Sequence, residues 1–212
     1  MSRFGVISDV HADVHALEDA LRHLAARECD GIVCCGDLVD FGLFPDETLA
    51  LLALRKIPTI SGNHDRWAVE GGGSGGGWDL SRESRKFLAS LPGSHVFERD
   101  GVRVAVHHGS PRGDMDGIYP EEIGFELARQ HLQRAAADVM IVGHTHIPFR
   151  LEVEGVGVIV NPAAVLRSPA EGAENPPATG AFGVLELPSR AFSVHRTTDG
   201  VEVEILRKRL AP

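Results

Sequence analysis

Residues that can bind a metal ion follow five apolar runs of the sequence, at the points where strands would end. They are Asp9 and His11 after "FGVIS", Asp37 after "GIVCC", Asn63, His64 and Asp65 after "IPTIS", His107 and His108 after "VRVAV", and His144 and His146 after "DVMIVG". In open α/β sheets, ligands bind beyond the carboxyl ends of the strands. Because these residues offer oxygen and nitrogen atoms and no Cys is among them, the set is typical of a hard or borderline metal ion.

Each group taken alone also fits a simpler explanation. Asp9 can cap the helix that follows it, and Gly36-Asp37 and "GNHD" (62–65) have the composition of polar turns. "GHTH" (143–146) is more specific, because two imidazoles at i and i+2 after a buried strand suit metal ligation better than packing. Taken together, the five groups predict a metal site.

The set offers too many ligands for one ion. Seven of these residues would be enough to hold two divalent cations about 3.5–4 Å apart, with Asp37 free to bridge them. Such a pair clamps both oxygens of an in-line displacement at phosphorus. The sequence therefore predicts a dinuclear site for phosphoester chemistry.

The elements that would position these residues alternate between strands and helices over the first two thirds of the chain. Period-two and helical patterns predict strands at 3–8, 31–35, 57–61, 102–108 and 138–143, and helices near 14–27, 45–55, 80–91 and 121–135. In the last third, 149–155 and 156–161 resemble a hairpin, and 181–187, 190–196 and 201–208 resemble half-solvated antiparallel strands. We expect a mixed architecture with helices outside and sheets inside.

Composition narrows the class of protein. The 212 residues are 43% hydrophobic, which suits one globular domain. We expect a cytoplasmic protein that does not enter a membrane, because no apolar run has the length of a signal peptide or approaches the roughly 20 residues of a membrane span. The formal charge of -9 and the lack of a long basic run argue against binding to duplex nucleic acid, and "LRKRL" (206–210) is interpreted as a solvated tail.

Cysteines and glycine-rich segments add little about function. The three cysteines, Cys29, Cys34 and Cys35, are an odd set with two adjacent residues, so we expect buried reduced thiols and no disulfide framework. The segments 70–78 and 168–180 are expected to be mobile surface loops. Since the first follows "GNHD", it could be either a lid or simply a linker.

The order of the motifs "DVH", "GDLVD", "GNHD", "HHG" and "GHTH" resembles the calcineurin-like metallophosphoesterases, and the resemblance spans Asp9 to His146. "GDLVDFGLFPDETL" and "VNPAA" are similar to the small bacterial and archaeal phosphodiesterase-like branch. The resemblance implies an α/β fold, a four-layer αββα sandwich of two mixed sheets flanked by helices, with residues 1–212 as a single domain. The chain departs from the family at Ala163-Ala164, where a Gly-Ser often follows Asn-Pro, so a hydroxyl is lost there.

The resemblance also implies a role for each motif residue. It makes Asp9, His11, Asp37 and His146 the ligands of one ion, and Asp37, Asn63, His108 and His144 the ligands of the other; His107 does not match the motif. His64 would stabilise or protonate the leaving oxygen, and Asp65 would orient that imidazole and favour its protonated form. The nucleophile would be a metal-bridging hydroxide. The implied cofactor is two divalent ions per chain, such as Mn, Fe or Zn.

The sequence thus predicts a metal-dependent phosphoesterase for small phosphodiesters or phosphomonoesters. The alternatives are a dinucleoside polyphosphate hydrolase or a phosphoprotein phosphatase of the same fold, and a non-catalytic protein-binding scaffold. The occupied ligand positions and His64 argue against the scaffold. Homo-oligomerisation is compatible with the sequence. The sequence does not identify the substrate or the native metal.

Substrate contacts beyond the metals stay open as well. Arg66 and Arg112 lie beside motif residues and are either phosphate contacts or solvated side chains. Phe41, Trp67 and Trp78 are either an apolar wall for the substrate or packing residues.

Overall fold

The four predicted helices and most of the predicted strands are present in the structure. The structure, a computed structural model, describes residues 1–71, 80–167 and 180–212. Within these residues the helices are α1 (Val14–Ala26), α2 (Pro45–Leu54), α3 (Asn63–Glu70), α4 (Arg82–Ser90) and α5 (Phe125–Ala135). None of the helices in the described part of the chain is long and apolar enough to cross a membrane.

The strands form two mixed sheets. The five-stranded sheet has the order β10-β9-β8-β1-β2, with β1 (Ser2–Ile7), β2 (Gly31–Cys34), β8 (Ala181–Leu187), β9 (Ala191–Arg196) and β10 (Glu202–Val203). The six-stranded sheet has the order β11-β6-β7-β5-β4-β3, with β3 (Ser94–Arg99), β4 (Val102–His107), β5 (Val139–Ile141), β6 (Phe149–Val153), β7 (Gly157–Asn161) and β11 (Leu206–Leu210). β1 is parallel to β2, and β4 is parallel to β5, so the carboxyl ends within each pair lie together.

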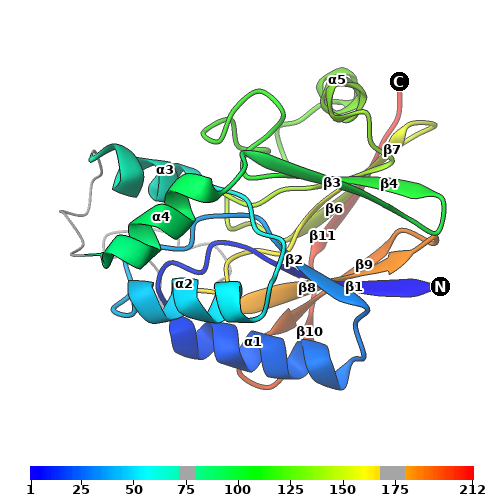
Figure 1. Cartoon of the computed structure of the whole chain (residues 1–212). Helices are drawn as coiled ribbons and strands as arrows, with labels where there is room; N and C mark the ends of the chain where they lie inside the picture. The colour runs from blue at the N-terminus through cyan, green and yellow to red at the C-terminus, as the bar shows by residue number, and fades with distance from the viewer. Residues whose placement is uncertain (72–79, 168–179) are drawn as a thin grey trace.

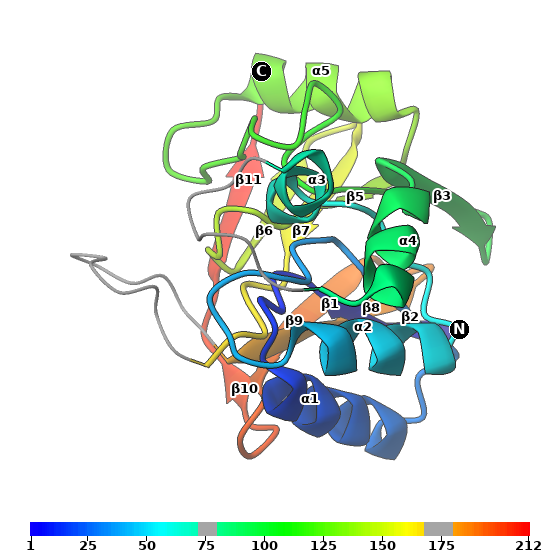
Figure 2. The ribbon, with the colours of Figure 1, turned by 60° about the vertical axis from the view of Figure 1, so that its left-hand side comes forward.

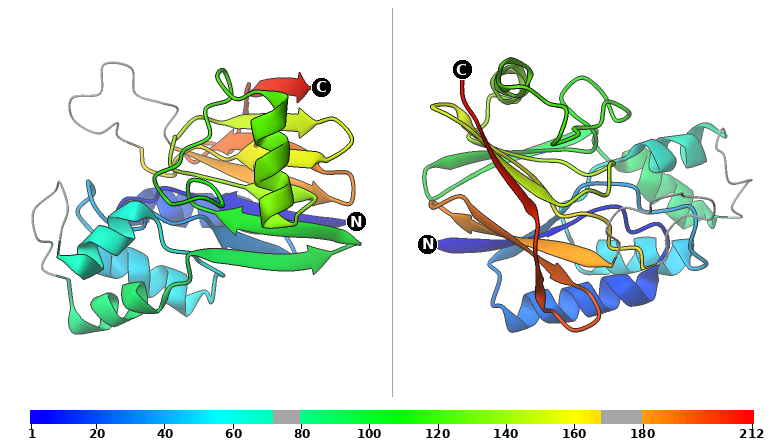
Figure 3. Two further views of the ribbon diagram at one scale, coloured as in Figure 1. Left: turned by 90° about the horizontal axis from the view of Figure 1, so that it is seen from above. Right: turned by 180° about the vertical axis from the view of Figure 1, so that it is seen from behind.

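The two sheets pack face to face between helical layers. Figure 1 shows α1 and α2 against the outer face of the five-stranded sheet and α5 on the outer side of the six-stranded sheet; Figure 3 shows the same layers from two other sides. α3 and α4 lie at one end of the sandwich, away from the N-terminus (Figures 1 and 2). This confirms the predicted four-layer αββα sandwich.

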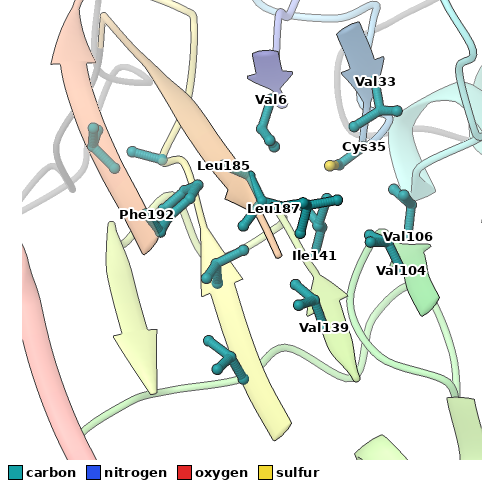
Figure 4. Packing of buried hydrophobic residues seen from close by; sticks show 14 of the residues in the cluster. Val6, Val33, Cys35, Val104, Val106, Val139, Ile141, Leu185, Leu187 and Phe192 are labelled. Carbon is teal, nitrogen blue, oxygen red and sulfur yellow. The ribbon is translucent and has the colours of Figure 1, made fainter. Parts of the chain in front are cut away.

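Alternation along the strands fills three cores: one between the two sheets and one on the outer face of each sheet. Val6 and Cys35 lie in the cluster between the sheets (Figure 4), whereas Cys34 faces the cluster beneath α1 and α2. Ile141 also faces the middle, whereas its neighbour Met140 faces α5. These strands are continuously apolar because both of their faces are buried, and each large side chain contributes about 1.5–3 kcal/mol.

The cysteines agree with the predicted reduced state. All three are free thiols; Cys34 and Cys35 are buried and Cys29 is half-buried. Burial raises the pKa of Cys35 well above its usual range, which keeps this thiol protonated and unreactive.

The structure differs from the sequence prediction at two elements in the early part of the chain. The segment 57–61 is not a strand: only Thr59 forms a bridge, to Cys34, because Pro58 has no backbone N–H to extend the ladder. β3 was not predicted and pairs antiparallel with β4 as the edge of the six-stranded sheet.

The last predicted strand, 201–208, divides between the two sheets. β10 pairs antiparallel with β9, whereas β11 pairs parallel with β6. The "LRKRL" segment is therefore β11 and not a solvated tail. Leu210 is buried, and the Lys208 ammonium donates to the Pro120 carbonyl at 3.1 Å. The expectation of half-solvated strands also fails for β8, which is nearly all buried because one of its faces packs beneath α1 and the other packs between the sheets.

The glycine-rich segments 70–78 and 168–180, predicted to be mobile loops, lie almost entirely outside the described residues. Trp78 lies outside them too.

Candidate metal centre

The structure gathers the seven predicted ligands at the carboxyl ends of β1, β2, β4 and β5 and the start of α3. Two groups of three can each hold an ion, with the ligand atoms of a group within 4.8 Å of one another. The first group is Asp9, His11 and His146, and the second is Asp37, His108 and His144. The two groups correspond to the two sets that the motifs implied, except that Asp37 is not in the first group and Asn63, which lies beside the second group, is in neither.

The first group surrounds the imidazole of His146. Its Nε2 lies 3.2 Å from Asp9 Oδ1 and 3.3 Å from Nε2 of His11. His11 Nδ1 donates to the Val39 carbonyl at 3.1 Å, which leaves the Nε2 lone pair free to bind a metal. Two imidazole nitrogens and a carboxylate oxygen thus converge on one position.

The second group is arranged in the same way. Asn63 Oδ1 lies 2.9 Å from Nδ1 of His144 and 3.1 Å from Nε2 of His108. His108 Nδ1 donates to the Cys35 carbonyl at 2.8 Å, which leaves its Nε2 lone pair free to bind a metal. The backbone carbonyls therefore select the imidazole tautomer in both groups.

Asp37 lies between the two groups. Its Oδ2 is 3.0 Å from Nε2 of His108 and 4.0 Å from Nε2 of His11, whereas its Oδ1 accepts the His64 backbone N–H at 2.9 Å. One carboxylate oxygen therefore faces both candidate ion positions while the other is held by the backbone. This is the placement that a bridging ligand requires.

Asp9 shows directly that the donor set suits a cation. The side chain is fully buried, and Oδ2 accepts hydrogen bonds from Ser8 Oγ at 2.5 Å and from the His144 N–H at 3.1 Å. From the described part of the chain, Oδ1 receives no well-aligned hydrogen bond, although His146 Nε2 lies 3.2 Å away. A buried carboxylate oxygen without a donor is costly unless an ion binds it. The residues present therefore fit a divalent metal.

The charge distribution of the metal-free site supports the same conclusion. Burial alone would lower the pKa of His108, but the Asp37 carboxylate raises it to about 10. Burial opposes the effect at His146 too, yet Asp9 raises its pKa. Burial lowers the pKa of His11 to about 4, so this imidazole is neutral and able to ligate. Asp37 and Asp9 thus favour positive charge at His108 and His146, which is the charge that bound ions would supply.

Backbone strain is concentrated at this cluster. Five of the seven ligands have a positive φ: Asp9, His11, Asp37, His144 and His146, with φ of 53°, 47°, 54°, 64° and 56°. Left-handed backbone is unfavourable for side chains with a Cβ and persists where the surroundings enforce it. The sharp bends turn the side chains at the strand ends inward, toward one another.

Two motif glycines make room for the cluster. A Cβ at Gly62 would lie 2.1 Å from Asp37 Oδ1, and a Cβ at Gly143 would lie 2.0 Å from Ser8 Oγ. Only glycine allows these backbones to approach so closely. The glycines of "GNHD" and "GHTH" are thus required by the packing of one loop on another.

Asp65 does not have the position that the sequence suggested. Its two oxygens accept the backbone N–H groups of Leu38 at 2.8 Å and Gly62 at 2.9 Å. The second bond caps α3, since Asp65 is its third residue. His64 is paired instead with Asp40, whose Oδ2 lies 2.7 Å from His64 Nδ1. The assignment of Asp65 as the partner of His64 is therefore corrected to Asp40.

"GNHD" is accordingly more than a polar turn. It begins α3, with Gly62 as the N-cap. Asn63, at the first helical position, faces the metal ligands, and His64 shares a third group of possible ligand atoms with His11 and Asp37. His64 thus lies directly beside the candidate ion positions.

Asn161 is a site residue that sequence analysis missed. It is fully buried at the end of β7, and its Nδ2 donates to the Gly143 carbonyl at 2.8 Å and to Thr145 Oγ1 at 3.2 Å. Its Oδ1 accepts the Ala163 N–H at 2.8 Å. Asn161 thereby holds the "GHTH" turn. The sequence analysis noted "VNPAA" as a family similarity, but no feature of the neighbouring sequence indicated that its Asn would hold the "GHTH" turn.

The remaining candidates lie around the cluster. Arg66 donates to both oxygens of Asp114, at 2.7 and 3.2 Å, and Arg112 lies 3.6 Å from Asp116, so carboxylates partner both guanidinium groups. A cavity of about 540 Å³ lies between these arginines and His108; His107 lines it and does not join either ligand group. Phe41 and Trp67 both contact the His64 ring, with centroid distances of 5.1 and 4.9 Å.

Comparison with known proteins agrees with this geometry. Residues 2–181 match the Calcineurin-like phosphoesterase superfamily domain. A probable metallophosphoesterase of Methanothermobacter thermautotrophicus is 33% identical over 165 residues, which cover 76% of this chain and 75% of that protein. An uncharacterised protein of Methanocaldococcus jannaschii is 29% identical over 169 residues, 73% of this chain and 66% of its own length. The crystal structure of a metallophosphoesterase from Sphaerobacter thermophilus superimposes with a TM-score of 0.67 at 28% identity, covering 92% of this chain and 87% of the other.

Proposed function

Because this chain belongs to the calcineurin-like phosphoesterase superfamily, we propose that it is a metal-dependent hydrolase of small phosphodiesters or phosphomonoesters. The observation that carries the proposal is the position of Asp37. Its Oδ2 lies 4.0 Å from His11 Nε2 in the first group of possible ligands and 3.0 Å from His108 Nε2 in the second. Two divalent ions bound there would act as Lewis acids on the phosphoryl oxygens and activate water for in-line attack.

The ligands in this proposal are the seven residues that the motifs implied. Asp9, His11 and His146 would hold one ion, Asn63, His108 and His144 the other, and Asp37 both. The carbonyls of Val39 and Cys35 fix the tautomers of His11 and His108, which would keep the nitrogen lone pairs directed at the ions.

His64 would serve as the general acid. With Nδ1 hydrogen-bonded to Asp40, its Nε2 is the nitrogen left to exchange a proton with a leaving oxygen. Its place beside His11 and Asp37 puts it within reach of a phosphoester held at the centre. Asp40 is then a positioning residue, because it orients the imidazole without contacting the substrate.

Hydrolysis by the metal-loaded chain tests the proposal. The purified protein would be stripped with a chelator, reloaded separately with Mn, Fe or Zn, and assayed on phosphodiesters, phosphomonoesters, dinucleoside polyphosphates and phosphopeptides. We expect up to two ions per chain, activity on simple esters that disappears on stripping, and recovery on reloading. Full activity of the metal-free protein would exclude this mechanism, and metal binding without activity on any substrate would favour the scaffold.

The substrate panel also separates the enzyme classes that share this fold. A clear preference for a dinucleoside polyphosphate or a phosphopeptide over simple esters would replace the proposed substrate class while leaving the metal site in place.

A further inference from the structure

Phe41 is a large apolar side chain exposed to solvent at the edge of the candidate metal centre. It is 45% exposed, although its ring contacts two of the polar residues of the site. The ring centroids of Phe41 and His11 are 4.8 Å apart, and those of Phe41 and His64 are 5.1 Å apart. Because His11 and His64 are themselves 4.9 Å apart, the three rings contact one another in pairs.

The position of Phe41 is enforced by the backbone. Phe41 has φ 63°, in the left-handed region that is uncommon for an aromatic residue. Neighbouring hydrogen bonds hold the loop in place: the Gly42 N–H donates to the His11 carbonyl at 2.8 Å, and the Phe44 N–H to the Ala12 carbonyl at 3.1 Å. A strained backbone that holds an exposed aromatic ring against a site is typical of a binding position.

The charged side chains around the metal centre indicate what kind of group the Phe41 surface would suit. Arg66 is paired with Asp114 and Arg112 with Asp116, so these cations are already matched by carboxylates. The phosphoryl charge would be balanced by the metals, and the ester group beyond it would meet the Phe41 ring. An uncharged planar group fits such a surface, because aromatic rings stack on one another through their apolar faces.

The proposed role of His64 relates the leaving group to Phe41. An oxygen that takes a proton from His64 must lie next to that imidazole, and the Phe41 ring contacts the same imidazole. A group attached to that oxygen would therefore lie next to a residue that the Phe41 ring contacts.

We propose that Phe41 is a stacking platform that binds a planar aromatic ester group, such as a nucleobase or a phenyl ring, on the leaving-group side of the phosphorus. The inference rests on the proposed function, since it assigns the substrate class of the same site. It makes Phe41 a specificity-determining residue that acts by contact with the substrate.

Equilibrium binding of two phosphonates to the metal-loaded chain tests the platform without turnover. Benzylphosphonate carries a ring and propylphosphonate does not, and the P–C bond of each resists hydrolysis. Calorimetry would compare the wild type with Phe41→Ala and Phe41→Leu. The matched control is Leu43→Ala, a change in the same loop at a side chain that is 78% exposed.

We expect the wild type to bind benzylphosphonate more tightly than propylphosphonate. Phe41→Ala and Phe41→Leu should each weaken benzylphosphonate binding by about 5- to 30-fold, the usual value of one stacking contact, with little change for propylphosphonate. Leu43→Ala should change neither affinity. The leucine variant keeps the apolar bulk that shields His11, so it carries the test if the alanine variant fails to fold.

Two results would overturn the platform. One is a wild type that binds both phosphonates equally well; the other is an equal loss for both phosphonates in the Phe41 variants at unchanged metal content, which would mean that Phe41 only supports the histidines. Hydrolysis of simple esters by the wild type is measured in parallel. If an aromatic preference is found without hydrolysis of any ester, the platform stands and the proposed function fails. If esters are hydrolysed but the wild type shows no aromatic preference, the proposed function stands and the platform fails.

Discussion

Asp40 and Asp65 are two buried carboxylates with separate tasks, one on the His64 imidazole and one on the backbone. We expect Asp40→Asn to retain the fold and the bound metals and to lower turnover, because His64 loses the partner that orients it. The loss in turnover should not exceed the contribution that general acid catalysis usually makes, which is about 10²- to 10⁴-fold. Metal analysis and the kcat for an alkyl phosphoester measure both effects.

Asp65→Asn is the matched comparison at the residue scale. An amide there places an NH₂ group against the N–H of Leu38 or Gly62, so one buried donor loses its acceptor. We expect a loss of about 1–3 kcal/mol in the free energy of unfolding, measured by denaturant titration. If Asp65→Asn were as stable as the wild type and Asp40→Asn were not, the corrected roles would be reversed.

The His64 assignment makes a prediction about leaving groups. An alkoxide needs a proton to depart, whereas a nitrophenolate carries its charge without one. His64→Ala should therefore lower turnover of alkyl phosphoesters by about 10²- to 10⁴-fold and of a nitrophenyl ester clearly less. Steady-state rates for both esters, with metal content checked, decide the matter. Equal losses would show that His64 binds the phosphoryl group or supports Asn63 without donating a proton.

At the scale of elements, the site depends on loops that pack on one another at the strand ends. Gly62 ends one loop and faces Asp37 at the end of β2, and an added Cβ would lie 2.1 Å from the Asp37 carboxylate. Gly62→Ala should force the two loops apart, with a loss of about 1–3 kcal/mol in unfolding free energy and weaker metal binding.

Gly93→Ala is the control for this element. Within the described residues, no atom beyond its chain neighbours lies within 4 Å of a Cβ added at Gly93, and its φ is not positive. We expect it to change neither stability nor metal content by more than the usual surface range of about 0.5 kcal/mol. Thermal unfolding of both variants, with and without metal, measures the difference; a Gly62→Ala variant that binds metal normally would contradict the packing argument.

At the scale of the whole molecule, the metal ions should stabilise the fold. The proposed ligands follow the ends of β1, β2, β4 and β5 or begin α3, so ions bound to the native chain would tie both sheets together. Metal at about 100 times its Kd contributes about 2.7 kcal/mol, which corresponds to a rise of roughly 5–10 °C in Tm for a chain of this size. Calorimetry of stripped and reloaded protein measures the shift.

Asp37→Asn is the matched variant for that measurement. It removes the carboxylate that lies between the two groups of ligands, so both ions should bind less tightly. We expect its Tm to rise much less on addition of metal than that of the wild type. A full metal-induced shift in Asp37→Asn would contradict the bridging role.

The sequence by itself determined the fold family and the chemical type of the site. Apolar runs followed by Asp, Asn or His encode a strand and the polar loop at its end, and both are local features. The four-layer sandwich was predicted from the resemblance, and the order of the five motifs identified the superfamily. The structure confirms the sandwich, and the comparisons confirm the superfamily.

Tertiary structure alone decided which residues meet across the loops. His64 and Asp65 are adjacent in the chain, yet the partner of His64 is Asp40, 24 residues away, because a helical residue at position N3 turns back to its own N-terminus. Residues 201–208 have one alternating pattern, yet they divide between two sheets, because strand pairing depends on the neighbouring edge that is available. The support that Asn161 gives to the "GHTH" turn likewise depends on β7 lying beside β5, which periodicity does not encode.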